Sequence, residues 1–242
     1  MKDNTEIIMI KRKSLLLIIV CLLLFSFQSI SVYAVTDYQL KQAPDLMSEA
    51  RCAEIKILKD RISREISIQA SGGKSLSGVP NQQQINSFYC GPACTRNVLS
   101  YFGTSKTQST LGKNMETTSA EGTYVYKIVN CLNSYLGSGT YKYILTSELA
   151  FGTGMRSSIN NNKPVICHTM TGQLPIYKDN NKNVGHYVVA TGYAWAAQGS
   201  SGYNNVTYND PNYDNKYYGT HTCSWLTMES AIEKNAGYYI MG

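Results

Sequence analysis

Residues 84–94 read QINSFYCGPAC, and this stretch predicts a helix that begins at Cys90. Pro92 fits the first turn of that helix, because the N–H that proline lacks would be unbonded there anyway. Apolar residues then recur at three- and four-residue steps, and Gly103 ends the run as a C-cap glycine would. Cys90 is therefore expected at the N-terminus of a buried helix.

A cysteine in this position is suited to nucleophilic chemistry. The helix dipole and the free N–H groups of the first turn favour the thiolate, which is the form that attacks a carbonyl carbon. Gln84 precedes Cys90 by six residues and can place a side-chain N–H where an oxyanion would form. The alternative is a buried structural cysteine at the start of a helix.

The chain contains only three histidines that could act as a general base. His186 starts the β-rich run GHYVVATGY after a polar loop, so it is the favoured partner for Cys90. His168 lies inside the apolar run PVICHTM and is expected to fill an interior position, whereas His221 belongs to a tyrosine-rich hairpin.

Asp210 is the candidate that orients His186, because it ends the strand that follows the GHYVVATGY run. An aspartate before a proline is also a common turn residue, and this alternative stays open. Asp210, Asn212 and Asp214 imitate half of a calcium loop. The glycine and the glutamate that complete such a loop are missing, so we do not predict calcium.

The N-terminal region predicts export. Lys11-Arg12-Lys13 precedes an apolar run from Leu15 to Phe25, and small residues before position 35 predict cleavage after Ala34. Residues 1–34 are thus a predicted secretory signal, and the protein is expected to be secreted or held at the cell surface. An uncleaved anchor is the alternative, and translation could start at Met1 or at Met9.

The mature chain is predicted to divide at residue 78. Residues 35–46 look irregular, residues 47–69 predict an amphipathic helix, and residues 71–77 read as a linker. The 35–77 segment is either a removable pro-segment or a plain N-terminal extension. Residues 78–242 form the predicted domain.

The domain is predicted to be α+β, with a helical half followed by a mainly antiparallel sheet. Helices are expected near 107–115, 123–136, 147–160 and 228–234, and 173–184 is expected to be a loop. Strands are expected near 141–145, 164–170, 185–193, 206–209, 220–224 and 237–241.

Composition excludes several classes of function. The net charge of +6 is modest, and the basic residues after the leader are scattered, so no nucleic-acid partner is predicted. Six cysteines follow the predicted signal, and their spacing fits no zinc motif. We therefore expect no metal or cofactor, and interpret the cysteines other than Cys90 as small buried residues.

Three strings occur in this order along the chain: VPNQQQINSFYCGPAC, GHYVVATGY and VTYNDP. With them, the chain resembles the bacteriocin-processing (double-glycine) peptidase-like group of papain-fold cysteine peptidases. The resemblance implies a papain-like fold, with Cys90 as nucleophile, His186 as base and Asp210 as orienting acid. It also implies that Gln84 forms the oxyanion hole with the backbone N–H of Cys90.

Processing peptidases of that group are fused to a transporter and cut leader peptides, and this sequence has neither transporter spans nor a nucleotide-binding motif. We therefore expect a secreted peptidase with a peptide or protein substrate and no stable membrane partner after signal cleavage. The alternatives are an amidase or acyltransferase acting on cell-wall peptides and a non-catalytic binding module.

Overall fold

The computed structural model describes residues 36–66, 72–180, 182–195 and 204–242. Contacts divide the chain into a segment that ends at Thr36 and a compact unit, Asp37–Gly242, which contains all of the described helices and strands. The predicted signal at 1–34 lies outside the described residues. Within the described part of the chain, no helix is both long enough and apolar enough to cross a membrane.

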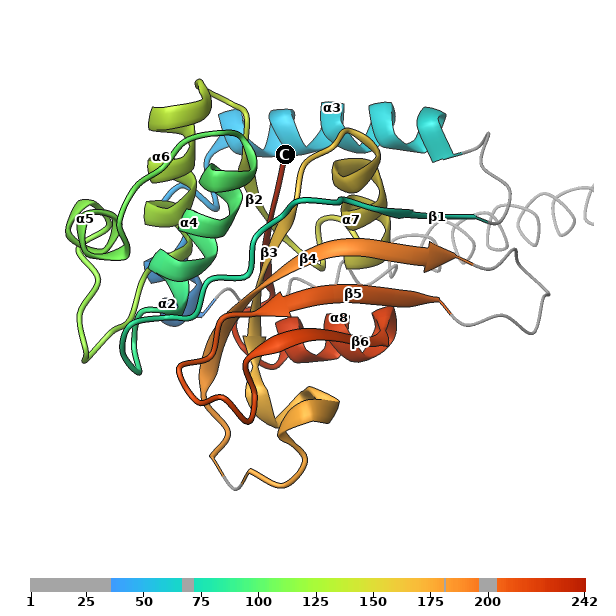
Figure 1. The fold of residues 1–242 in the computed structure, drawn as a ribbon. Coiled ribbons are helices and arrows are strands. Elements are labelled where there is room, and N and C mark those ends of the chain that lie inside the picture. Colours follow the sequence, from blue (N-terminus) through green and yellow to red (C-terminus); the bar gives the residue numbers. More distant parts are fainter. Residues whose placement is uncertain (1–35, 67–71, 181, 196–203) are drawn as a thin grey trace, which may run out of the picture. The chain divides into compact units, whose positions relative to one another are not determined.

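One antiparallel sheet forms the centre of the unit (Figure 1). Six of its strands follow the order β2-β7-β3-β4-β5-β6, and β1 pairs with the far end of β4. Every pairing among these strands is antiparallel. The strands are β1 (Gly72–Ser75), β2 (Lys142–Leu145), β3 (Val165–Met170), β4 (Gly185–Trp195), β5 (Asn205–Asp210), β6 (Gly219–Ser224) and β7 (Tyr238–Met241).

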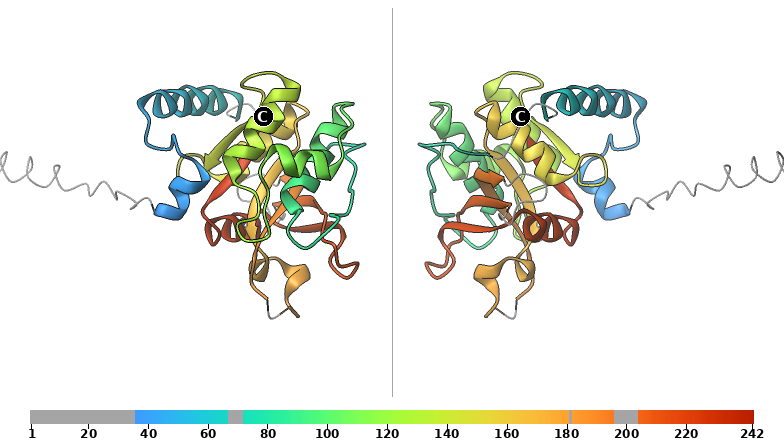
Figure 2. Two further views of the ribbon diagram at one scale, coloured as in Figure 1. Left: turned by 90° about the vertical axis from the view of Figure 1, so that its left-hand side faces the viewer. Right: turned by 90° about the vertical axis from the view of Figure 1, so that its right-hand side faces the viewer.

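Helices cover the sheet on both faces. α4 (Cys90–Tyr101), α5 (Gln108–Asn114) and α6 (Val125–Leu136) lie together, apart from α8 (Trp225–Glu233), as the turned views of Figure 2 show. α7 (Phe151–Asn160) shares one hydrophobic core with α8 and with alternate residues of β3 and β4. Helices α4, α5 and α6 come before six of the seven strands, and α7 and α8 are interspersed among those strands, which confirms the α+β prediction.

Two parts of the N-terminal segment are more ordered than the sequence indicated. Residues 35–46 were expected to be irregular, but Asp37–Gln42 forms helix α2. Its polar side chains reach distant backbone: the Val125 N–H donates to Gln42 Oε1 at 2.9 Å, and Gln39 Nε2 donates to the Ala236 carbonyl at 3.2 Å. Tertiary contacts of this kind leave no local pattern in six residues.

The expected linker at 71–77 is also corrected, because Gly72–Ser75 pairs with Gly192–Trp195 as strand β1. Glycine-rich sequence has low strand propensity, so the pairing is made by backbone hydrogen bonds that composition does not reveal. Cys52 was expected to be a small buried residue, but its side chain is exposed.

Two helix starts differ from those expected. α7 begins at Phe151 and not near Ser147, and the Phe151 N–H donates to Glu229 Oε1 of α8 at 2.8 Å. α8 is capped by Ser224, whose hydroxyl accepts the Thr227 N–H at 3.1 Å, and not by Thr227 itself. The expected loop at 173–184 contains a short helical turn, Pro175–Tyr177, and the whole of its Tyr177 side chain is buried.

Helix α3 (Glu49–Ile66) packs on the unit through an apolar stripe and confirms the predicted amphipathic helix. Ile55, Leu58 and Ile62 belong to the same hydrophobic cluster as α7 and the sheet. Arg51 strengthens this contact, because its guanidinium bonds both the Tyr143 carbonyl and Glu148, at 3.2 and 2.7 Å.

Replacing Ile62 by alanine should test how much α3 contributes to stability. Ile62 is 1% exposed, so we expect Ile62→Ala to lower the free energy of unfolding by about 2–5 kcal/mol, measured by denaturant titration. Ile57→Ala is the matched control, because Ile57 is 70% exposed on the same helix and should change stability by less than ~0.5 kcal/mol. Equal effects of the two changes would show that α3 does not pack as described.

Candidate active site

Cys90 is the first residue of α4, as the sequence predicts, and it is partly exposed. The residue after it must be small: a Cβ at Gly91 would lie 2.6 Å from Oγ1 of Thr123. The Thr123 carbonyl in turn accepts the hydroxyl of Tyr187 on β4, at 2.8 Å. Gly91 thus allows α4 to lie close to the segment that is bonded to β4, and this sets Cys90 near the sheet.

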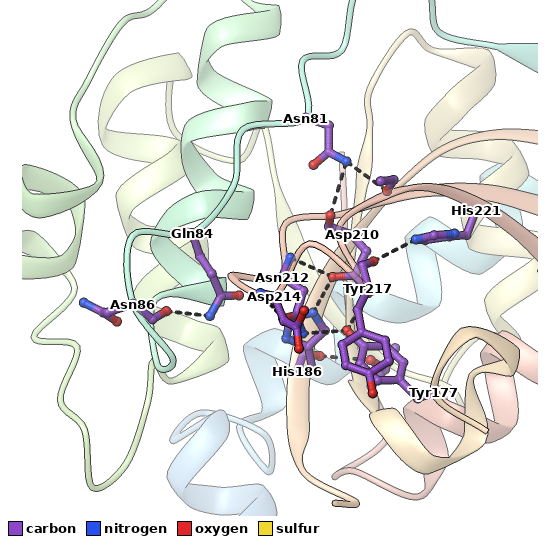
Figure 3. A network of polar contacts seen from close by, with 12 residues as sticks. Asn81, Gln84, Asn86, Tyr177, His186, Asp210, Asn212, Asp214, Tyr217 and His221 are labelled. Carbon is purple, nitrogen blue, oxygen red and sulfur yellow. Dashed lines mark hydrogen bonds and ion pairs between the residues drawn. The ribbon is translucent and has the colours of Figure 1, made fainter. Parts of the chain in front are cut away.

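His186 and Asp210 lie close together at one end of two neighbouring strands, where β4 begins and β5 ends. The register pairs Val189 with Asn209, so the chain positions before Val189 lie beside those after Asn209. His186 Nε2 lies 2.8 Å from Asp210 Oδ1, and both side chains are buried. Two separate strands therefore deliver a base and a carboxylate to one point (Figure 3).

Asp210 is fully buried, and three groups bond its carboxylate. Besides His186, the Asn212 backbone N–H donates to Oδ1 at 2.9 Å, and the Tyr177 hydroxyl donates to Oδ2 at 2.8 Å. Asn212 Nδ2 donates to the same hydroxyl at 2.8 Å, and the Tyr177 ring stacks on Tyr217. The sequence did not point to Tyr177, and it brought in Asn212 only as part of an incomplete calcium loop. The apolar cluster Leu174-Pro175-Ile176-Tyr177 was the one local sign that part of this loop is buried.

The surroundings of His186 change its basicity. Burial by itself would lower the His186 pKa, but the charge and hydrogen bond of Asp210 outweigh burial, and the Cys90 thiol beside the ring adds to this effect. Together they raise the His186 pKa to about 10. The site therefore favours a protonated imidazolium next to Cys90, which is the partner that stabilises a thiolate.

Gln84 lies in the same site and is 4% exposed. Its Nε2 donates to the Asn86 carbonyl at 2.6 Å, which holds the amide in one orientation and leaves the second N–H of that nitrogen for another acceptor. Gln83 is directed elsewhere, because its amide bonds the Tyr213 carbonyl and Asn215. Of these two neighbouring glutamines, Gln84 is the one that lines the same pocket as His186.

The other histidines are placed differently. His168 is buried and stacks on the Tyr187 ring, with 4.3 Å between ring centroids, and burial lowers its pKa to about 3. His221 packs against Tyr208, and its Nε2 lies 2.8 Å from the Tyr217 carbonyl. Among the residues that the structure describes, no group of three or more histidine, cysteine or acidic side chains is arranged to hold a metal ion.

Comparison with known proteins identifies a family. The model of the Peptidase_C39 like family matches residues 76–238. No curated protein matches the sequence. Several solved structures do, among them a C39-like peptidase from Bacillus anthracis, with 18% identity and a TM-score of 0.47 over 70% of this chain and 96% of that one.

Two further matches are peptidase domains of transporters. The peptidase domain of Streptococcus ComA, a bifunctional ABC transporter of a quorum-sensing pathway, is 20% identical, with a TM-score of 0.41 over 66% of this chain and 94% of that one. A double glycine motif protease from an AMS/PCAT transporter, in complex with its leader peptide, is 16% identical, with a TM-score of 0.41 over 69% and 93%.

Asp210→Asn should lower the His186 pKa, because the variant keeps the burial and loses the negative charge. We expect the ring of the unmodified protein to titrate well above its ordinary value of 6.5, and that of the variant at or below it, in an NMR titration. A pKa raised on folding also means that this pair stabilises the fold fully below pH 6.5 and loses its effect as the pH rises through about 10.

The control for this titration is Asp179→Asn, which removes an exposed carboxylate that solvent screens. It should leave the His186 titration unchanged. If the ring titrates near 6.5 in the unmodified protein, the described pairing with Asp210 is wrong.

Tyr177→Phe should destabilise the protein, because it leaves Asp210 Oδ2 buried without the donor that it has now. An unsatisfied buried acceptor costs about 1–3 kcal/mol, which denaturant titration would detect as a lower free energy of unfolding. Tyr213→Phe, at a ring that is 55% exposed, is the control and should be nearly neutral. A neutral Tyr177→Phe would show that the hydroxyl does not bond the carboxylate in solution.

Proposed function

Because the chain belongs to the Peptidase_C39 like family, we propose that it is a secreted cysteine peptidase with Cys90 as nucleophile, His186 as base and Asp210 as orienting acid. The observation that carries this proposal is the buried 2.8 Å contact between His186 and Asp210, with Cys90 beside the same ring at the start of α4. The predicted signal at 1–34 supports secretion.

The first half of the proposed reaction forms an acyl-enzyme. The proton of Cys90 rests on His186, as the raised pKa of the imidazole favours, and the thiolate sulfur attacks the carbonyl carbon of the peptide bond. A C–S bond forms while the carbonyl oxygen takes the negative charge. His186 then gives its proton to the peptide nitrogen, the C–N bond breaks, and the amine leaves.

The second half uses water. His186 accepts a proton from a water molecule whose oxygen attacks the thioester carbon. The C–S bond breaks, the acid product leaves, and the sulfur is again a thiolate beside the protonated His186. Asp210 keeps its charge throughout, because its role is to orient the ring and to stabilise the imidazolium.

Gln84 is proposed to stabilise the oxyanion in both halves together with the backbone N–H of Cys90. The bond from Gln84 Nε2 to the Asn86 carbonyl supports this role, because a donor that is already fixed needs no reorganisation when charge develops. Loss of such a donor typically lowers kcat by roughly 10²–10³-fold.

Selective labelling of Cys90 would test the proposal. At pH 7, iodoacetamide should modify Cys90 faster than Cys52, as measured by mass spectrometry over time, although Cys52 is the more exposed thiol. The buried thiols should react slowest, because burial raises the pKa of Cys94, Cys131, Cys167 and Cys223.

Cys90→Ala should abolish cleavage of casein or of a peptide library, and Cys52→Ala should leave it unchanged. His186→Ala should slow the labelling of Cys90 without altering that of Cys52. If Cys52 is labelled faster than Cys90, or cleavage survives in Cys90→Ala, the proposed chemistry is wrong.

A further inference from the structure

A pocket of about 230 Å³ opens beside His186, between three segments of the chain. Gln84 and Ser87 line it from the segment before α4, Tyr177 and Lys182 from the segment before β4, and Asp214 and Tyr217 from the turn after β5. We propose that this pocket binds the residue immediately after the scissile bond, and that it favours a positively charged side chain there. The inference rests on the proposed peptidase function.

The lining residues place the pocket on the leaving-group side of the site. His186 and Gly185 form part of its wall, whereas neither Cys90 nor any other residue of α4 does. In acyl transfer the acyl portion stays on the sulfur, and the amine takes its proton from the imidazole. A pocket that borders the imidazole and not the sulfur therefore lies where the leaving amine and its side chain must go.

The size and the surface of the pocket fit one polar residue. Its volume is below the roughly 300–1,000 Å³ that is usual for pockets that enclose a drug-sized molecule. Val184 is the only aliphatic side chain among its lining residues, and the others carry hydroxyl, amide, phenol or charged groups, apart from the imidazole of His186 and the glycine at 185. A bulky aliphatic side chain would bury little apolar surface here.

Two fixed acceptors favour a donor-rich ligand. Gln84 Oε1 is buried without a hydrogen-bond partner, and Figure 3 shows this oxygen on the side of Asn212 and Asp214, away from Asn86. The Asp214 carboxylate is held by the Lys216 N–H, which donates to Oδ1 at 2.9 Å, and no ion pair joins it to another described residue. An ammonium or guanidinium in the pocket would pair with the Asp214 carboxylate, and the Gln84 oxygen adds negative potential to the same pocket.

Lys182 is the one cation in the lining, and it opposes this preference. Its side chain is exposed, and no hydrogen bond or ion pair ties it to the rest of the described chain, so it can turn into solvent without losing a contact. Asp214 is exposed as well, but its carboxylate accepts the Lys216 N–H and is held on its own turn by this bond. The fixed charge of the pocket is therefore negative.

The test compares peptides that differ only in the residue after the cleaved bond. Peptides with lysine there should be cleaved with a kcat/KM roughly three- to tenfold above those with leucine or glutamate. Asp214→Asn should remove this preference, whereas Lys182→Met should retain or increase it. Asp179→Asn, an exposed carboxylate outside the lining, is the control and should behave like the unmodified protein.

A binding measurement separates failure of this inference from failure of the proposed function. The full chain carrying Cys90→Ala should bind the lysine peptide more tightly than the leucine peptide, and should lose this difference when Asp214→Asn is added, whether or not any peptide is turned over. Equal binding of the lysine, leucine and glutamate peptides would overturn the subsite. A glutamate preference that Lys182→Met abolishes would also overturn it, even if cleavage occurs.

Discussion

The carboxylate of Asp210 is the group on which the arrangement of the site depends. A fully buried carboxylate is tolerated only where charge and hydrogen bonds replace water. Three segments supply them: His186 from β4, Tyr177 from the loop before β4, and the Asn212 N–H from the turn directly after Asp210. The same requirement that stabilises the anion therefore also fixes the imidazole ring and the loop beside it.

The sequence was sufficient for those parts of the protein whose signals are local. Cys90 at a helix start and Asp210 at a strand end follow from glycine, proline and short apolar runs, and most regular elements lie within a few residues of their expected positions. The errors fall where distant contacts decide. Glu229 caps α7, the backbone of β4 orders Gly72–Ser75, and Asp210 orders Tyr177, none of which a local window contains.

Contact between the helical half and the sheet depends on a few small or polar residues. Gly91 removes the side chain that would collide with Thr123, and the Thr123 carbonyl binds Tyr187 of β4. Tyr187 also stacks on His168, the histidine that sequence reasoning assigned to the interior. These contacts hold the start of α4 against the start of β4. Gly91 therefore helps to set the position of the Cys90 sulfur relative to the His186 ring.

The proposed reaction and the proposed substrate preference depend on different parts of the chain, and these parts differ in rigidity. The sulfur, the imidazole and the carboxylate sit at the ends of α4, β4 and β5, where regular hydrogen bonding limits their movement. Apart from Gly185 and His186 of β4, the walls of the neighbouring pocket come from turns and loops, most of whose side chains can change without altering the sheet. Asp214 shares a turn with Asn212 but not its contact with the buried carboxylate, so a charge on the pocket wall can change while Asp210 keeps all three of its bonds. Specificity in such a site can therefore diverge while the reacting groups keep their geometry.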